Sequence, residues 1–399
     1  MSKKRGFGPT MTMLTVLNML SGCASAGAEG PCEALNEHLS TCGAILDEAS
    51  HSCDPDEVDA VLAMDCDQIG TVASAGKADG TWDRLLCTLG FESRCPLGAP
   101  VRDPATGRLD RYDLPGATLH PEAGAFSVRQ NAFFVGSLDD GGVLRVDAAS
   151  GEVSTLLAPQ HEDWSSLGMA VQEDINRLWV CAIRDVDAQY GEVWSIDMNT
   201  GARARYDLRD AHEHGSCNDL ALGPDGTVYV TDRENPNVYV LRPGAETVEL
   251  LVSDPVLAPP RLGLGQNGIV VLPEEAGLIT TQYLPPRLNF VSFSSETPTV
   301  ERIEVDGDFH DYSSLGSGAD GMVLLGGSLF VMFATELVEV ALAPDYRSGT
   351  AHAIGVRGGM TDVVPVEDEL YLLNGQAVAF VAGADPAGTF ALFRFDASR

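Results

Sequence analysis

The chain has 399 residues, of which 44% are hydrophobic, and its 58 acidic and 25 basic residues give a formal net charge of −33 at pH 7. This length suits a large folded domain with an appendage, and the hydrophobic content is typical of globular proteins. The excess of acidic residues argues against nucleic-acid binding, which needs clustered Lys and Arg, and favours the attraction of cations. An acidic surface that only reflects the habitat is the alternative.

The N-terminus has the layout of a secretory signal. Three basic residues, 3–5, precede a mostly apolar run, Met11–Leu20, that is too short to span a bilayer. The following Leu20-Ser-Gly-Cys23 resembles the lipobox of bacterial lipoproteins, whose Cys becomes the acylated first residue, with palmitate among its lipids. The resemblance implies a signal peptide over residues 1–22, a lipid anchor on Cys23 and, because Ala24 follows, the outer membrane of the cell envelope. The alternative is an ordinary secretory peptide cleaved nearby.

Residues 23–100 are predicted to form a small disulfide-rich module and a linker. Besides Cys23 the chain has eight cysteines, an even number that suits an oxidising compartment. Six of them lie here without any CxxC spacing, which makes zinc a poor candidate: Cys32, Cys42, Cys53, Cys66, Cys87 and Cys95. We expect short helices over residues 32–46 and 58–63 and three disulfides, whose pairing the sequence leaves open. No protein partner of this module is indicated.

From residue 101 to residue 399 the pattern is β. Short apolar or alternating runs are separated by turn sequences such as Pro224-Asp-Gly226. A short phrase recurs at intervals of 42 to 53 residues, and an apolar run follows each copy. The phrases begin at Glu122, Gly168, Asn218, Asn267, Asp320 and Asp362. A repeat of this length made of short strands predicts an all-β fold, a six-bladed β-propeller.

A propeller must close its ring, and the sequence suggests how. The run Leu109–Leu114 precedes the first repeat and has no blade of its own. We expect it to pair with the strand Thr389–Phe395 and so complete the last blade, which also removes an exposed strand edge.

Several phrases resemble one family. His120-Pro-Glu122, Asn218-Asp-Leu-Ala-Leu222 and Gly318-Ala-Asp-Gly321 resemble the senescence-marker-protein/gluconolactonase/luciferin-regenerating-enzyme family, and the paraoxonases are similar in architecture. The resemblance implies six blades around one divalent cation, with Ca²⁺ first and Mg²⁺ or Mn²⁺ as alternatives. Matched by position, the implied metal ligands are Glu122, Asn218, Asn267 and Asp320, with Asn218 also contacting the substrate. The arginine of sugar lactonases has no clear counterpart, which argues against an aldonolactone.

The chemistry of these four side chains agrees with the resemblance. Two carboxylates and two amide oxygens suit a hard cation, and no His or Cys favours zinc. A cation open on one side can polarise a lactone or ester carbonyl, while Asp320 or Asp219 accepts a proton from the attacking water. For each residue alone, an Asx turn or a backbone cap is the alternative.

Other polar residues near the repeat heads are weaker candidates. His212 and His214 lie before Asn218, and His120 lies before Glu122. Each is a candidate general base and His214 also a candidate substrate contact; a solvated loop side chain is the alternative.

Two further features lie near the repeat heads. Asp362 heads the sixth repeat and either faces the channel or caps a turn. Cys181 and Cys217 lie near adjacent strand ends, where a disulfide would brace the wall beside Asn218, with two buried thiols as the alternative.

These observations support two hypotheses. The first is a metal-dependent hydrolase of lactones or related esters, anchored to the cell envelope. The second is a non-catalytic propeller that uses the metal to recognise a ligand or partner at the cell surface. The sequence leaves open whether the chain is an enzyme at all, because a propeller fold hosts many functions.

The lipid anchor is directly testable. Cys23→Ser should move the protein from the membrane fraction to the soluble fraction, because without the thiol no acyl chains are attached and those chains supply the membrane affinity. Fractionation of cells expressing wild type and variant measures this. Equal membrane partitioning of the two proteins would refute the lipobox interpretation.

Overall fold

The computed structural model describes residue 38, residues 61–63 and residues 99–395 except for 117–118, 161–162, 185–189, 261–263, 310–317, 383–385 and 387. The chain divides into two compact units, Met1–Ala99 and Pro100–Arg399. In the first unit only residue 38, residues 61–63 and residue 99 are described, so the signal segment, Cys23 and the six cysteines from Cys32 to Cys95 lie outside the described residues.

The second unit is built almost entirely of β-sheet, which confirms the all-β prediction for this part of the chain. Three sheets each contain four consecutive antiparallel strands. They are β2 (Gly124–Ser127), β3 (Ala132–Gly136), β4 (Val143–Asp147) and β5 (Val153–Leu157); β6 (Trp164–Gln172), β7 (Arg177–Arg184), β8 (Gly191–Asp197) and β9 (Arg203–Asp207); and β10 (Leu220–Leu222), β11 (Val228–Thr231), β12 (Asn237–Leu241) and β13 (Glu249–Ser253).

A fourth sheet has eight strands and consists of two such four-stranded meanders. The first is β14 (Leu264–Val271), β15 (Gly277–Leu284), β16 (Arg287–Ser292) and β17 (Thr299–Gly307); the second is β18 (Met322–Leu325), β19 (Ser328–Met332), β20 (Glu336–Leu342) and β21 (Ser348–Gly355). Their outermost strands, β17 and β21, pair in parallel from Glu304 with Ser348 to Gly307 with Ala351. The sequence did not predict this connection.

The last sheet joins the two ends of the β region. Its order is β1-β24-β23-β22, with β1 (Arg111–Asp113), β22 (Met360–Val366), β23 (Glu369–Asn374) and β24 (Ala391–Phe395). Strand β1 pairs with β24 in antiparallel register, Tyr112 opposite Leu392. The predicted pairing of residues 109–114 with residues 389–395 is therefore confirmed.

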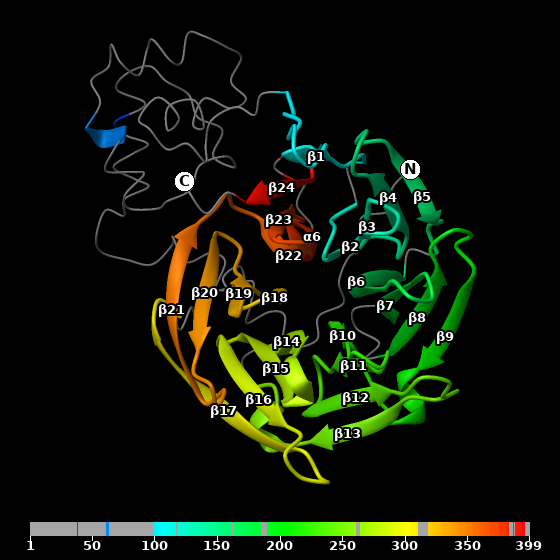
Figure 1. Cartoon of the computed structure of the whole chain (residues 1–399), viewed down its shortest axis with the longest axis vertical. Helices are drawn as coiled ribbons and strands as arrows, with labels where there is room; N and C mark the ends of the chain where they lie inside the picture. Colours follow the sequence, from blue (N-terminus) through cyan, green and yellow to red (C-terminus); the bar gives the residue numbers. More distant parts are fainter. Residues whose placement is uncertain are drawn as a thin grey trace. The chain divides into compact units, whose positions relative to one another are not determined.

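The first strand of every meander lies toward the centre of this unit. Figure 1 shows β2, β6, β10, β14, β18 and β22 around the centre, with the later strands of each meander farther out. The six repeat heads all lie at or within these first strands, and the apolar runs that follow them form the second strands, β3, β7, β11, β15, β19 and β23. The repeat therefore places its polar heads at the centre of the ring.

Packing between neighbouring sheets forms the core. One apolar cluster joins β7 and β8 with β10 to β12 through Cys181, Leu220 and Tyr239, and another joins the closing sheet to the first through Tyr112, Phe133 and Tyr371. Because each sheet buries its faces against two neighbours, the ring is stabilised only when it is closed.

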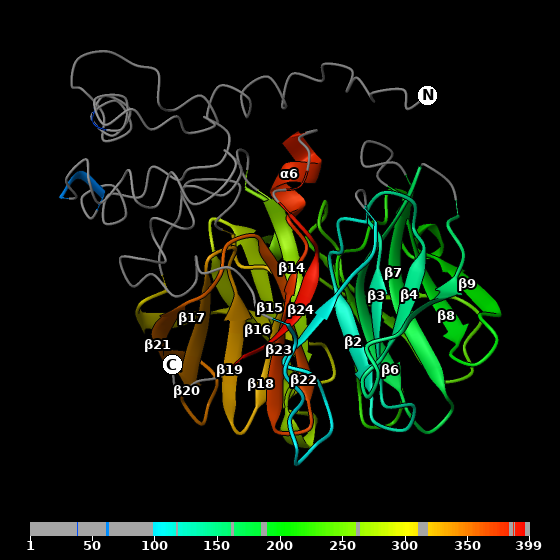
Figure 2. The same cartoon turned by 90° about the horizontal axis from the view of Figure 1, so that it is seen from above.

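Helical structure is sparse among the described residues of this unit. Three short 3₁₀ turns, η2 (Leu208–Asp210), η3 (Pro255–Leu257) and η4 (Pro273–Glu275), connect strands, and α6 (Ala377–Ala382) follows β23. Figure 2 shows α6 at one end of the ring. The sequence analysis did not predict α6, and no described helix is long and apolar enough to cross a membrane.

Tyr112 is the residue through which the closing strand should be tested. Its side chain is 1% exposed, its hydroxyl donates to the Ala148 carbonyl at 2.7 Å, and its ring lies 5.0 Å from that of Phe133. Tyr112→Ala should lower the free energy of unfolding by about 3–5 kcal/mol, as expected for a large buried aromatic side chain. Tyr112→Phe keeps the ring and should cost about 0.5–1.5 kcal/mol for each hydrogen bond of the lost hydroxyl, the one donated to Ala148 and the one accepted from the Leu109 N–H. Denaturant unfolding measures both; an Ala variant as stable as the Phe variant would contradict the role of β1 in closure.

Candidate functional site

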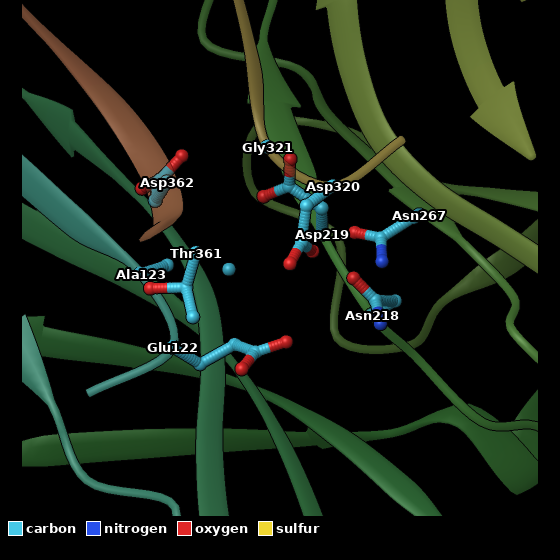
Figure 3. A pocket seen from close by; sticks show the side chains of 10 residues that line it. Glu122, Ala123, Asn218, Asp219, Asn267, Asp320, Gly321, Thr361 and Asp362 are labelled. Atoms are coloured by element: carbon cyan, nitrogen blue, oxygen red, sulfur yellow. The ribbon is translucent and has the colours of Figure 1, made fainter. Parts of the chain in front are cut away.

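The repeat heads surround one small cavity at the centre of the ring. It is lined by Glu122, Ala123, Gly168, Asn218, Asp219, Asn267, Asp320, Gly321, Thr361 and Asp362. Figure 3 shows the carboxyl and amide groups of these residues turned toward a common space, although they come from segments far apart in the sequence. The cavity has a volume of about 10 Å³, roughly what one water molecule needs.

Local irregularities of the strands help to turn the heads inward. The pairing of β6 with β7 shifts register between Ser166 and Met169, that of β14 with β15 between Gln266 and Ile269, and that of β22 with β23 between Met360 and Asp362. Each shift falls at a repeat head. An extra residue in one strand bends it and redirects its side chains, so these bulges aim the Asn267 and Asp362 side chains at the centre.

Four carboxyl groups share this space, and their electrostatics are unusual. Burial raises the pKa of Glu122 to about 7, and Arg233 opposes the shift only in part. Burial likewise raises the pKa of Asp219 to about 7. The pKa values of Asp320 and Asp362 are raised well above the usual range, first by burial and then by neighbouring carboxylates. The charged forms are therefore disfavoured unless a positive charge compensates them.

Glu122 is the clearest sign of a missing partner. Its Oε2 atom is buried and has no hydrogen-bond partner, which is uncommon for a buried carboxyl oxygen. Within the described ranges, no three His, Cys, Asp or Glu side chains are grouped closely enough to hold a metal ion by themselves. Any cation here would need the amide oxygens of Asn218 and Asn267, so the residues fit a mixed carboxylate and amide ligand set.

Asp219 and Asp362 occupy equivalent positions in the two halves of the ring. Asp219 accepts hydrogen bonds from the backbone N–H groups of Leu220 at 2.7 Å and Ile269 at 3.3 Å. Asp362 accepts from Val363 at 2.8 Å and Gly124 at 2.9 Å. Each carboxylate thus ties its own strand to the first strand of the next meander. The two alternatives for Asp362, facing the channel and capping the backbone, both hold.

Two glycines allow this arrangement and were not identified from the sequence as site residues. A Cβ atom on Gly168 would lie 2.0 Å from Oδ1 of Asp219, and one on Gly321 would lie 2.0 Å from Oδ1 of Asp362. Any side chain at either position would push the carboxylate away. The sequence could have indicated both residues, because Gly168 is a repeat head and Gly321 follows one. Glycine is common where two backbone segments approach closely.

The disulfide predicted beside Asn218 is present. Cys181 on β7 and Cys217 are bonded, with their Cα atoms 5.9 Å apart. Both are fully buried. The bond ties the residue before Asn218 to the neighbouring sheet, which confirms this pair among the predicted disulfide candidates.

The histidines lie outside the cavity lining. His214 is exposed, and its backbone carbonyl accepts a hydrogen bond from Asn235. His120 is 5% exposed, and its ring packs 4.9 Å from that of Phe390 and 5.4 Å from that of Phe380 on α6. The substrate contact by His214 and the general-base role of the three histidines remain predictions.

Solved structures share this fold. No protein-family model and no curated protein matches the sequence. The allergen Mala s 1 of Malassezia sympodialis superposes with a TM-score of 0.58 at 16% identity, over 72% of this chain and 96% of the allergen. A gluconolactonase from Xanthomonas campestris superposes with a TM-score of 0.51 at 16% identity, over 75% of this chain and 99% of the gluconolactonase. A luciferin-regenerating enzyme superposes with a TM-score of 0.52 at 10% identity, over 74% of this chain and 95% of that enzyme.

Two of these proteins are the ones that the sequence resemblance named, so that resemblance is confirmed at the level of the fold. At such low identity the likeness establishes the fold alone. The function has to be argued from the site.

The raised pKa values predict how pH affects the thermal stability of the protein when a chelator has removed divalent cations. Unfolded carboxyls titrate near pH 4, whereas Glu122 and Asp219 titrate at about 7 in the fold. The folded state therefore binds these protons more tightly than the unfolded state does. Proton binding contributes its full stabilisation of the fold below about pH 4, and this stabilisation is lost as the pH rises through 7. We expect the thermal midpoint in chelator to fall from pH 5 to pH 8, and calcium to raise it more at pH 8.

Circular-dichroism melts with chelator or calcium at each pH provide the measurement. Glu122→Gln is the matched variant, since it keeps the shape but cannot titrate, and its midpoint should depend less on pH. A chelated wild-type midpoint that rises between pH 5 and pH 8 would contradict the assignment.

Proposed function

We propose that this chain is a divalent-cation-dependent hydrolase of lactones or related esters, built on a six-bladed propeller. The six blades correspond to the three separate meanders, the two meanders of the eight-stranded sheet and the closing sheet. The proposal rests chiefly on the unpartnered, buried Oε2 of Glu122 in a cavity of about one water molecule, surrounded by oxygen donors from separate sheets.

The ligand assignment follows from the unpartnered Oε2 of Glu122 and from the other side-chain oxygens that line the cavity with it. Glu122 and Asp320 would supply charge, and Asn218 and Asn267 would supply amide oxygens. Such an all-oxygen set suits Ca²⁺ better than Mg²⁺ or Mn²⁺, because Ca²⁺ accepts irregular geometry and more ligands. Asp219 and Asp362 are already occupied with backbone N–H groups, so they are assigned to the wall of the site rather than to the ligands.

The chemistry follows from an electrophile beside proton acceptors. A bound divalent cation supplies positive charge that polarises a carbonyl and stabilises the negative charge that develops on attack. Asp219 lines the cavity beside Asn218 and is the candidate proton acceptor for the attacking water, with Asp320 as the second choice. Asn218 would orient the substrate through its amide group.

The site of action is proposed from the N-terminal segment. The lipobox-like Leu20-Ser-Gly-Cys23 supports attachment of the mature chain to the bacterial cell envelope, with the outer membrane favoured by Ala24. The substrate would then be met in an oxidising compartment, in agreement with the Cys181–Cys217 disulfide.

One observation favours a second function. The cavity between the repeat heads holds about one water molecule, a size that suits a bound ion. A propeller that uses a buried cation only to fix its shape, and that binds a ligand or partner without chemistry, would need no more. Turnover measurements distinguish this non-catalytic binding protein from the hydrolase.

The test combines cation binding with a substrate panel. Calcium at about 100 times its Kd should stabilise the wild type by about 2.7 kcal/mol, a rise of roughly 5 °C in the thermal midpoint. Glu122→Gln and Asp320→Asn should lose most of this rise because each removes a charged ligand, whereas Asn267→Ala should lose less. Asn218→Ala and Asp219→Asn should reduce turnover more than cation affinity. Calorimetric titration and a panel of lactones and esters provide the readouts.

The matched control is Asp225→Asn, in the turn between β10 and β11, where the side chain bonds only within its own turn. It should change neither calcium affinity nor turnover. A wild type whose midpoint ignores both calcium and chelator contradicts the cation site. One that binds calcium but hydrolyses nothing in the panel supports the binding protein instead.

A further inference from the structure

Three buried threonine hydroxyls contact the backbone that carries the proposed ligands. Oγ1 of Thr231 lies 2.6 Å from the carbonyl oxygen of Asn267, and Oγ1 of Thr281 lies 3.4 Å from that of Asp320. Oγ1 of Thr361 lies 3.1 Å from the carbonyl oxygen of Pro121, the residue before Glu122. Thr231 and Thr281 are fully buried and Thr361 is 2% exposed.

Each of these contacts crosses from one meander to the next. Thr231 ends β11 and reaches β14, and Thr281 on β15 reaches the segment just before β18. Thr361 on β22 reaches the segment just before β2, across the point where the ring closes. The same residue type thus fixes three of the four proposed ligand segments to the preceding meander.

Two of these positions are held from more than one side. The Thr231 hydroxyl also accepts a hydrogen bond from the backbone N–H of Asp219 at 3.1 Å, so one side chain joins the segments of Asn218 and Asn267. At Thr361 the chains are so close that a Cβ atom on Gly375 would lie 1.6 Å from the Pro121 oxygen and 2.5 Å from Oγ1. Such segments cannot shift relative to one another without straining or breaking these contacts.

The stiffness of the threonine side chain adds to the constraint. A β-branched side chain has few χ1 rotamers, so a buried threonine holds its hydroxyl at a fixed distance from its own strand. Ca²⁺ binds oxygen ligands at roughly 2.3–2.6 Å and Mg²⁺ at roughly 2.0–2.1 Å. A ligand ring that cannot contract by these few tenths of an ångström discriminates against the smaller ion.

We infer that Thr231, Thr281 and Thr361 are positioning residues that fix the ligand segments relative to one another and thereby set the preference of the site for the larger of two divalent cations. This inference rests on the proposed function, because it needs a cation at the site. Thr231 should matter most, since its contact is the shortest and it joins two ligand segments. Thr281 should matter least, since its contact is the longest.

The test measures the affinities of chelator-treated full-length protein for Ca²⁺ alone and Mg²⁺ alone by calorimetric titration. Thr231→Val keeps the branched shape and removes the hydroxyl. It should weaken Ca²⁺ binding by about tenfold and leave Mg²⁺ binding within about twofold, equivalent to about 1.4 kcal/mol for the calcium arm. Thr231→Ser restores the hydroxyl and should restore most of the preference. Thr361→Val and Thr281→Val should show the same change in decreasing size.

Thr227→Val is the matched control. Thr227 directly precedes β11 at its other end, is 5% exposed, and donates its hydroxyl to Asp225 at 2.8 Å rather than to a ligand segment. It should lower the thermal midpoint without changing the ratio of the two affinities. If Thr231→Val does not fold, the decision passes to Thr361→Val and Thr231→Ser.

The outcomes separate this inference from the proposed function. A calcium-binding wild type whose affinity ratio is unchanged by Thr231→Val and Thr361→Val, or is changed equally by Thr227→Val, overturns the inference and leaves the cation site standing. A wild type that binds neither ion overturns both.

Discussion

Four buried carboxyl groups that line one small cavity are the constraint on which the rest of this structure depends. Glu122, Asp219, Asp320 and Asp362 come from four different meanders, and burial raises the pKa of each. Removing carboxylates from water and placing them side by side opposes folding. The fold offsets this with backbone N–H groups at Asp219 and Asp362 and with the amide group of Asn267 at Asp320. A divalent cation is the simplest means of compensating what remains.

The four carboxylates divide into two kinds by their hydrogen bonds. Asp219 and Asp362 each accept two backbone N–H groups and each lie against a glycine, Gly168 or Gly321, so the two halves of the ring repeat one device. Glu122 has a buried oxygen with no such partner. Asp219 and Asp362 thus link neighbouring meanders of the ring, while the Glu122 carboxyl remains available to a ligand. This division explains why burial alone does not identify a functional carboxylate here.

The repeat heads could be found from the sequence because every copy lies just before or within an inner strand and recurs at a similar spacing. The closure by residues 109–114 followed from the same pattern. The parallel contact of β17 with β21, helix α6 and the threonine contacts could not be found in this way. Each depends on where two distant segments meet, and a local pattern of apolar residues does not encode that. Asp362 was recognised as a head, but only the bulge between Met360 and Asp362 shows which way it points.

The small size of the cavity implies that the residues that would bind the ion differ from those that would select the substrate. With space for about one water molecule, the centre of the ring has room for an ion but not for the body of an ester. The remainder of any substrate would lie over the mouth, where α6 follows Gly375 and packs against the segment before Glu122 through His120 and Phe380. Substrate choice would then depend on residues outside the ligand set.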